Sequence, residues 1–138
     1  MKPIMSSILL VDSSIWIDLH RGSLEPAKHR VLMPALERGE VALIPIIWLE
    51  LVVGFRSPQE RERIEDIRLA SQWVPMPDEV WEKAETTAAE LHQSGVMLRV
   101  ADLLILTVAD LADLKLLHCD RDFDRALKLK AFARLAPA

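Results

Sequence analysis

Two aspartates stand directly after segments that are expected to form strands, and a third follows shortly after the second. Asp12 follows the run over 8–11, and Asp120 follows the run over 116–119, with Asp122 two residues further on. In open α/β sheets, ligands bind beyond the carboxyl ends of the strands. These carboxylates are therefore the first candidates for a site that binds or transforms a ligand.

Two further carboxylates lie inside strongly apolar segments. Glu50 lies within the run over 46–53, and Asp102 lies within the run over 100–105. Carboxylates are seldom buried unless they are paired, protonated or bound to a metal ion. A shared cation would account for all of these acidic positions, and oxygen ligands select hard ions such as Mg²⁺ or Mn²⁺.

Each acidic residue also has a purely structural interpretation. Asp12 precedes Ser13 and Ser14 and could cap a helix over 14–19, a role that aspartate favours. Asp102 falls in a first helical turn, where the helix dipole favours a negative charge whatever the function. Both alternatives stay open at the level of the sequence.

The other three carboxylates have structural alternatives as well. Glu50 could pair with Arg56 or another basic residue. Asp120 and Asp122 could be a solvated loop residue and a helix N-cap. The coincidence of these carboxylates favours a shared site, because most of them lie in apolar surroundings and all are expected at one end of a sheet.

The elements that would position these residues alternate between strands and helices. The predicted strands cover 8–11, 41–44, 73–74 and 114–118. The predicted helices cover 14–19, 26–38, 45–55, 58–72, 77–94, 100–111 and 122–130, and 131–135 is a candidate edge strand. The helix over 100–111 is apolar on nearly all sides, so we expect it at the centre of the domain.

This alternation predicts a doubly wound α/β domain. Parallel strands need crossover connections, which place helices on both faces of the sheet. A chain of 138 residues of which 51% are hydrophobic is long enough for one such domain. Because no repeat and no Pro-, Gly- and Ser-rich linker divides the chain, we expect a single domain over 1–138.

Charge and cysteine content narrow the class of protein. The net charge of −4 argues against a protein that holds nucleic acid by a broad basic surface. Cys119 is the only cysteine, which excludes an internal disulfide and a multi-cysteine metal site. The apolar run over 8–11 is too short for a signal peptide or a membrane span. We expect a cytoplasmic protein with no membrane association, whose synthesis starts at Met1 or Met5.

Four segments resemble, in order, the acidic motifs of the PIN-domain toxins of the VapC family. Segment 11–18, Val-Asp-Ser-Ser-Ile-Trp-Ile-Asp, resembles the opening strand and turn of the family. Segments 45–54 and 100–106 resemble the second and third acidic motifs, and Leu-His-Cys-Asp-Arg-Asp-Phe at 117–123 resembles the fourth. The match covers nearly the whole chain, and the four motifs together are quite specific.

The resemblance implies a PIN fold whose sheet has about five parallel strands. It also implies the toxin of a type II toxin–antitoxin pair, a Mg²⁺- or Mn²⁺-dependent endoribonuclease that forms a homodimer and is inhibited by a small VapB-type antitoxin. Water would attack the RNA phosphorus in line, and the 3′-oxygen would leave.

The acidic residues have different expected roles at such a site. Asp12 and Asp102 are the first choices as direct metal ligands, because Mg²⁺ keeps several waters and uses few protein carboxylates. Glu50 and Asp120 would bind through water, complete a second metal position or orient the attacking water. Asp122 would be an outer contributor.

Other side chains are candidates for support and for RNA binding. Ser14 would hydrogen-bond an acidic ligand or the phosphate, or simply begin a helix. His118 stands where the family commonly has Thr or Ser, and a catalytic base at this position is not required, because a hard cation already lowers the pKa of water. The candidates for phosphate contacts are the arginines near the acidic motifs, Arg56, Arg99, Arg121 and Arg125.

Competing functions fit the sequence less well. A two-component receiver domain would need an aspartate after a middle strand, and the segment Trp73-Val74-Pro75 offers none. A haloacid-dehalogenase-type phosphatase would need a second aspartate at position 14, which is serine. The alternative that stays open is a non-catalytic interaction module whose acidic pocket binds basic partners.

Overall fold

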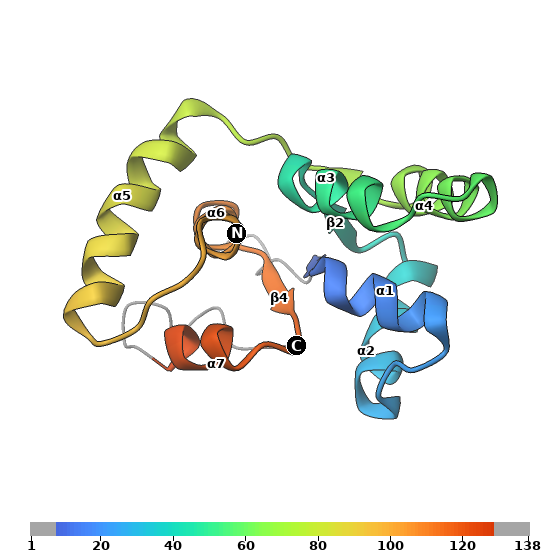
Figure 1. The fold of residues 1–138 in the computed structure, drawn as a ribbon, viewed down its shortest axis with the longest axis horizontal. Helices are drawn as coiled ribbons and strands as arrows, with labels where there is room; N and C mark the ends of the chain where they lie inside the picture. Colours follow the sequence, from blue (N-terminus) through green and yellow to red (C-terminus); the bar gives the residue numbers. More distant parts are fainter. Residues whose placement is uncertain (1–7, 129–138) are drawn as a thin grey trace, which may run out of the picture.

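The computed structural model describes residues 8–128, in which a parallel sheet lies between helices (Figure 1). The strand order is β3-β2-β1-β4, and every neighbouring pair is parallel. The four strands are β1 (Leu9–Val11), β2 (Val41–Leu43), β3 (Gln72–Trp73) and β4 (Lys115–Leu117). The predicted parallel α/β architecture is confirmed. The candidate edge strand over 131–135 lies outside the described residues.

Seven helices connect and follow these strands within residues 8–128. They are α1 (Ser13–Arg21), α2 (Pro26–Glu37), α3 (Pro45–Gly54), α4 (Pro58–Ala70), α5 (Asp78–Gln93), α6 (Val100–Leu111) and α7 (Arg121–Leu127). In Figure 1, α1 to α4 lie on one side of the strands and α5 to α7 on the other, as a doubly wound fold requires. None of the described helices combines the length and the apolar character that a membrane crossing needs.

The predicted boundaries differ from the structure at the edge strand and in the first and last helices, the first helix covering Ser13–Arg21 instead of 14–19. The helix predicted over 58–72 ends at Ala70, and the strand predicted over 73–74 begins one residue earlier, at Gln72. Ser71 is already extended, with φ −108° and ψ 153°. Both residues of β3 are exposed, so no apolar pattern marks where the strand begins. The helix predicted over 122–130 begins at Arg121 and ends at Leu127.

The pairing of β1 with β4 brings the segments of Asp12 and Asp120 next to each other. Leu10 of β1 pairs with Leu116 of β4, and the backbone N–H of Asp12 donates to the carbonyl of Leu117 at 3.0 Å. Because the pairing is parallel, both strands end at the same edge of the sheet. The segments that follow β1 and β4 therefore leave the sheet next to each other.

The helix α6 lies at the centre of the fold, as its apolar composition predicts. It packs against α5, α3 and β4. Every residue from Leu104 to Asp110 is buried. Burial on nearly all sides fixes the helix in place, and with it the orientation of its first turn.

We predict that Leu10→Ala lowers the free energy of unfolding by about 2–5 kcal/mol, because Leu10 is fully buried in β1 and its truncation leaves a cavity under the acidic edge. Leu69→Ala is the matched control, since Leu69 is 84% exposed on α4, and its effect should stay within about 0.5 kcal/mol. Urea denaturation measures both. Equal effects of the two substitutions would contradict this description of the core.

Candidate active site

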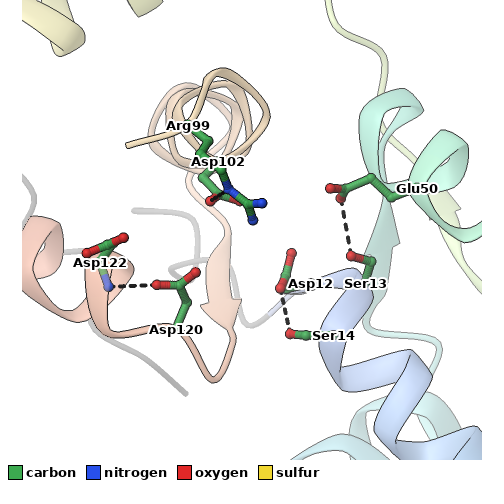
Figure 2. A network of polar contacts seen from close by, with 8 residues as sticks. All are labelled: Asp12, Ser13, Ser14, Glu50, Arg99, Asp102, Asp120 and Asp122. Atoms are coloured by element: carbon green, nitrogen blue, oxygen red, sulfur yellow. Dashed lines mark hydrogen bonds and ion pairs between the residues drawn. The ribbon is translucent and has the colours of Figure 1, made fainter. Parts of the chain in front are cut away.

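A cavity of about 210 Å³ opens at the carboxyl ends of β1 and β4. Four of the predicted acidic residues line it, and each comes from a different segment of the chain: Asp12, Glu50, Asp102 and Asp120. The other lining residues are Ser13, Ser14, Ile17, Arg99 and Cys119. Figure 2 shows the four carboxylates around one space, between α1, α3, α6 and the turn before α7.

Asp12 occupies the N-cap position of α1, but its side chain makes no capping hydrogen bond. Instead its Oδ2 accepts a hydrogen bond of 2.6 Å from the hydroxyl of Ser14, and the residue is only 7% exposed. The capping interpretation of Asp12 is therefore wrong. The thiol of Cys119 in turn donates to the hydroxyl of Ser14 at 3.4 Å, so Ser14 links both strand ends.

Glu50 is brought to the cavity by α3, which begins with Pro45 directly after β2. Its Oε1 accepts a hydrogen bond of 3.2 Å from the hydroxyl of Ser13. Burial, followed by the negative charge of Asp12, raises the pKa of Glu50. The proposed Glu50–Arg56 pair does not occur in the described part of the chain, where the Nε of Arg56 donates to the carbonyl of Val53.

Asp102 lies in the first turn of α6 and is 6% exposed. Burial raises its pKa, and the negative charges of Asp12 and Asp120 add to this increase. The helix dipole and Arg99, whose Nε lies 3.4 Å from Oδ2 of Asp102, act in the opposite direction. They do not fully offset the burial and the repulsion, so the first-turn location alone does not account for this carboxylate.

Asp120 is both an N-cap and a residue that lines the cavity. Its Oδ1 accepts a hydrogen bond of 2.7 Å from the backbone N–H of Asp122 at the start of α7. The N-cap is therefore Asp120 and not Asp122, and this capping role does not compete with a place in the site. The carboxylate of Asp122 lies 3.7 Å from Arg125 and points away from the other carboxylates in Figure 2.

The four arginines proposed for phosphate contacts lie in different places. Arg99 is the only one that lines the cavity, and Figure 2 shows its guanidinium reaching between the carboxylates. Arg56 follows the far end of α3, and Arg121 and Arg125 are exposed on α7. In the described part of the chain, Arg99 is thus the one cation placed to contact both an acidic residue of the site and a bound phosphate.

Sequence reasoning did not single out Ser13 and Cys119 as site residues. Ser13 holds Glu50, and Cys119 contacts Ser14. Their positions directly after Asp12 and directly before Asp120 are the only features of the sequence that could have indicated them. Residue type gave no indication for Ser13, because serine is a common residue at the start of a helix.

The donor set of the cavity fits a hard divalent cation. All four acidic groups offer carboxylate oxygens, and burial and mutual repulsion raise the pKa of Glu50 and Asp102, so a positive charge placed between them would be favoured. Within residues 8–128, however, no three acidic, histidine or cysteine side chains lie close enough together to coordinate a metal ion. Binding would therefore require the carboxylates to draw inward or to use bridging waters, which Mg²⁺ commonly keeps.

We predict that Asp102→Asn makes the EDTA-treated protein more stable at pH 7.5. The pKa of Asp102 is raised in the folded state. The contribution of Asp102 to the free energy of unfolding is therefore fully present below the ordinary pKa range of a carboxyl group, where Asp102 is protonated, and it is lost as the pH rises through the raised pKa. The gain should shrink as the pH falls toward 4. Asp113→Asn, in the exposed turn after α6, is the control and should change little. Thermal melts at both pH values test this, and a less stable Asp102→Asn variant at pH 7.5 would contradict it.

Comparison with known proteins places the chain in a family. Residues 9–129 match the family model of the PIN domain. The chain is 32% identical over 124 residues to Ribonuclease VapC21 of Mycobacterium tuberculosis. This alignment covers 88% of this chain and 87% of that protein.

Solved structures with the same fold include VapBC2 from Rickettsia felis, bound to a DNA fragment from its promoter. The TM-score is 0.72 and the sequence identity is 18%, and the match covers 86% of this chain and 92% of that chain. FitAcB from Neisseria gonorrhoeae has a TM-score of 0.70 and 17% identity over 86% and 93%. The fold, the four acidic segments and the sequence match agree, and the chain belongs to the PIN-domain family, in which it is a relative of VapC.

Proposed function

We propose that this protein is the toxin of a type II toxin–antitoxin pair and cleaves RNA as a metal-dependent endoribonuclease. The observation that carries the proposal is the convergence of four carboxylates from four segments on one cavity. The relative that shares 32% identity is named a ribonuclease, which supports the choice of RNA as substrate. The acidic cavity and the net charge of −4 do not by themselves favour RNA over other substrates.

Asp12 and Asp102 are the proposed direct ligands of Mg²⁺ or Mn²⁺, because they are the two most buried of the four carboxylates. Glu50 and Asp120 would complete the coordination through water. Asp122 would contribute through its backbone N–H, which holds Asp120 in place. The bound cation would supply Lewis-acid activation of water and would neutralise charge on the phosphodiester.

The chain's own side chains would prepare the reaction. Ser14 and Ser13 fix the carboxylates of Asp12 and Glu50 by hydrogen bonds. The raised pKa of Glu50 suits it to accept a proton from the attacking water, because a general base works best when its pKa is near the working pH. Arg99, at the mouth of the cavity, would bind a phosphate oxygen by a charge-assisted hydrogen bond.

We also propose a homodimer, in which two acidic sites would form a longer groove for structured RNA. The partner in the cell would be a small antitoxin of the VapB type. The solved structures with the same fold include VapBC complexes from Rickettsia felis and Salmonella typhimurium, which supports a partner of this kind.

We predict that Asp12→Asn and Asp102→Asn each lower the rate of Mg²⁺-dependent RNA cleavage by more than about 100-fold while the fold stays intact. A neutral amide binds Mg²⁺ poorly but conserves the volume of the side chain. Cleavage of a labelled RNA with Mg²⁺ or EDTA measures the loss, and Asp113→Asn should retain the full rate. Full activity in either ligand variant would remove that residue from the proposed site.

We predict that the antitoxin places an arginine among the four carboxylates and so excludes the metal ion. A guanidinium can pair with two carboxylates at once, and Arg99 already shows that one fits at this cavity. The product of the neighbouring reading frame should co-purify with the toxin and suppress both Mn²⁺ binding and RNA cleavage. If the pair co-purifies but still binds Mn²⁺ and cleaves RNA, the antitoxin acts elsewhere.

A further inference from the structure

His118 lies between the end of β4 and Asp120, and it does not line the acidic cavity. The residue is only 3% exposed, and its ring packs against Phe123, with the ring centroids 5.2 Å apart. Its Nδ1 accepts a hydrogen bond of 3.1 Å from the backbone N–H of Asp120. This buried imidazole therefore contacts the backbone of a cavity residue without contacting the cavity.

The hydrogen bond fixes the form of the imidazole. Because Nδ1 accepts a hydrogen bond, it carries no proton, and the neutral ring carries its proton on Nε2. Nε2 is buried and makes no hydrogen bond within the described residues, and it lies 3.4 Å from Oδ1 of Asp124. The one lone pair of the ring is thus already used by the backbone.

This arrangement excludes His118 as a base that acts on a substrate. A general base must reach the proton that it removes, directly or through one water. The only nitrogen of His118 that can accept a proton faces the backbone of Asp120, and the residue is almost fully buried. Its contribution must pass through Asp120.

Asp120 is held by two hydrogen bonds with different partners. Its backbone N–H donates to His118, and its Oδ1 accepts from the backbone N–H of Asp122. With the backbone and one carboxylate oxygen fixed, Oδ2 is the oxygen left to serve the cavity. Removing the acceptor at position 118 would leave the N–H of Asp120 without this partner and would free the turn to adopt other conformations.

We propose that His118 is a positioning residue, whose Nδ1 holds the β4–α7 turn so that the Asp120 carboxylate faces the metal site. The inference rests on the proposed function of the acidic cavity, and it assigns to His118 an effect on metal binding rather than on proton transfer.

Two variants of the full chain separate this role from general packing. His118→Asn keeps an acceptor, its Oδ1, at the place of Nδ1. His118→Gln keeps polarity and bulk but places its amide at the level of Nε2, away from the Asp120 N–H. The probe is Mn²⁺ alone, titrated calorimetrically into each variant after EDTA treatment and dialysis.

We expect His118→Asn to bind Mn²⁺ within about twofold of the unmodified protein and His118→Gln to bind about tenfold more weakly, as losses of outer supports at metal sites do. Equal affinities in both variants, whether retained or reduced, would overturn the proposal. The titration does not use RNA cleavage. A protein that binds Mn²⁺ without cleaving RNA would therefore contradict the proposed nuclease and not the role of His118.

A measurement on the unmodified protein keeps the proposal testable if both variants unfold. Long-range ¹H–¹⁵N spectra of the imidazole should show a single neutral tautomer, protonated on Nε2, and the Asp120 amide should exchange slowly with solvent. A ring protonated on Nδ1 at neutral pH, or a rapidly exchanging Asp120 amide, would overturn the proposal.

Discussion

The hydrogen bond from the Asp12 backbone to the Leu117 carbonyl joins segments from opposite ends of the described chain. It extends the parallel pairing of β1 with β4 by one step beyond the strands, at the point where both segments turn into their helices. The register of this pairing determines which side chains meet. A shift by one residue would turn each side chain of the strand to the other face of the sheet and separate Asp12 from the segment that carries Asp120.

The acidic cavity is electrostatically unfavourable for a chain without a bound cation, and the surrounding fold offsets part of this cost. Serine hydroxyls hold Asp12 and Glu50, the first turn of α6 carries Asp102, and the α7 N-terminus binds Asp120. The pKa of Glu50 and of Asp102 remains raised all the same. Perturbed carboxyl pKa values of this kind are typical of functional sites.

The acidic pattern and the alternation of strands and helices were sufficient to predict the fold and the four carboxylates that line the cavity. Both follow from local properties. Apolar runs mark the central strands, Asp12 and Asp120 follow strand ends, and Glu50 and Asp102 were indicated by the apolar segments around them. The exposed pair Gln72 and Trp73 lacks such a pattern, so the edge strand was misplaced by one residue. A helix N-cap was expected at Asp122 as an alternative, but the structure gives this role to Asp120, which also lines the cavity.

Closeness in the sequence did not predict which residues other than the carboxylates line the cavity. Arg56 is close to Glu50 in the chain, but it follows the end of α3 at Gly54 and the extended residue Phe55, and it does not line the cavity. Arg99 lines the cavity because it directly precedes α6 and its side chain folds back toward Asp102. The link from Ser13 to Glu50 likewise depends on the packing of α1 against α3.

The position of β4 in the chain has a consequence for synthesis on the ribosome. Strands β1, β2 and β3 emerge first and can pair with one another, but the second edge of β1 finds its partner only when residues 115–117 have left the exit tunnel. Until then the nascent chain carries an open, apolar strand edge and lacks Asp120. A nascent chain that has not yet exposed residues 115–120 therefore carries three of the four carboxylates, and the acidic cavity is complete only after these residues have emerged.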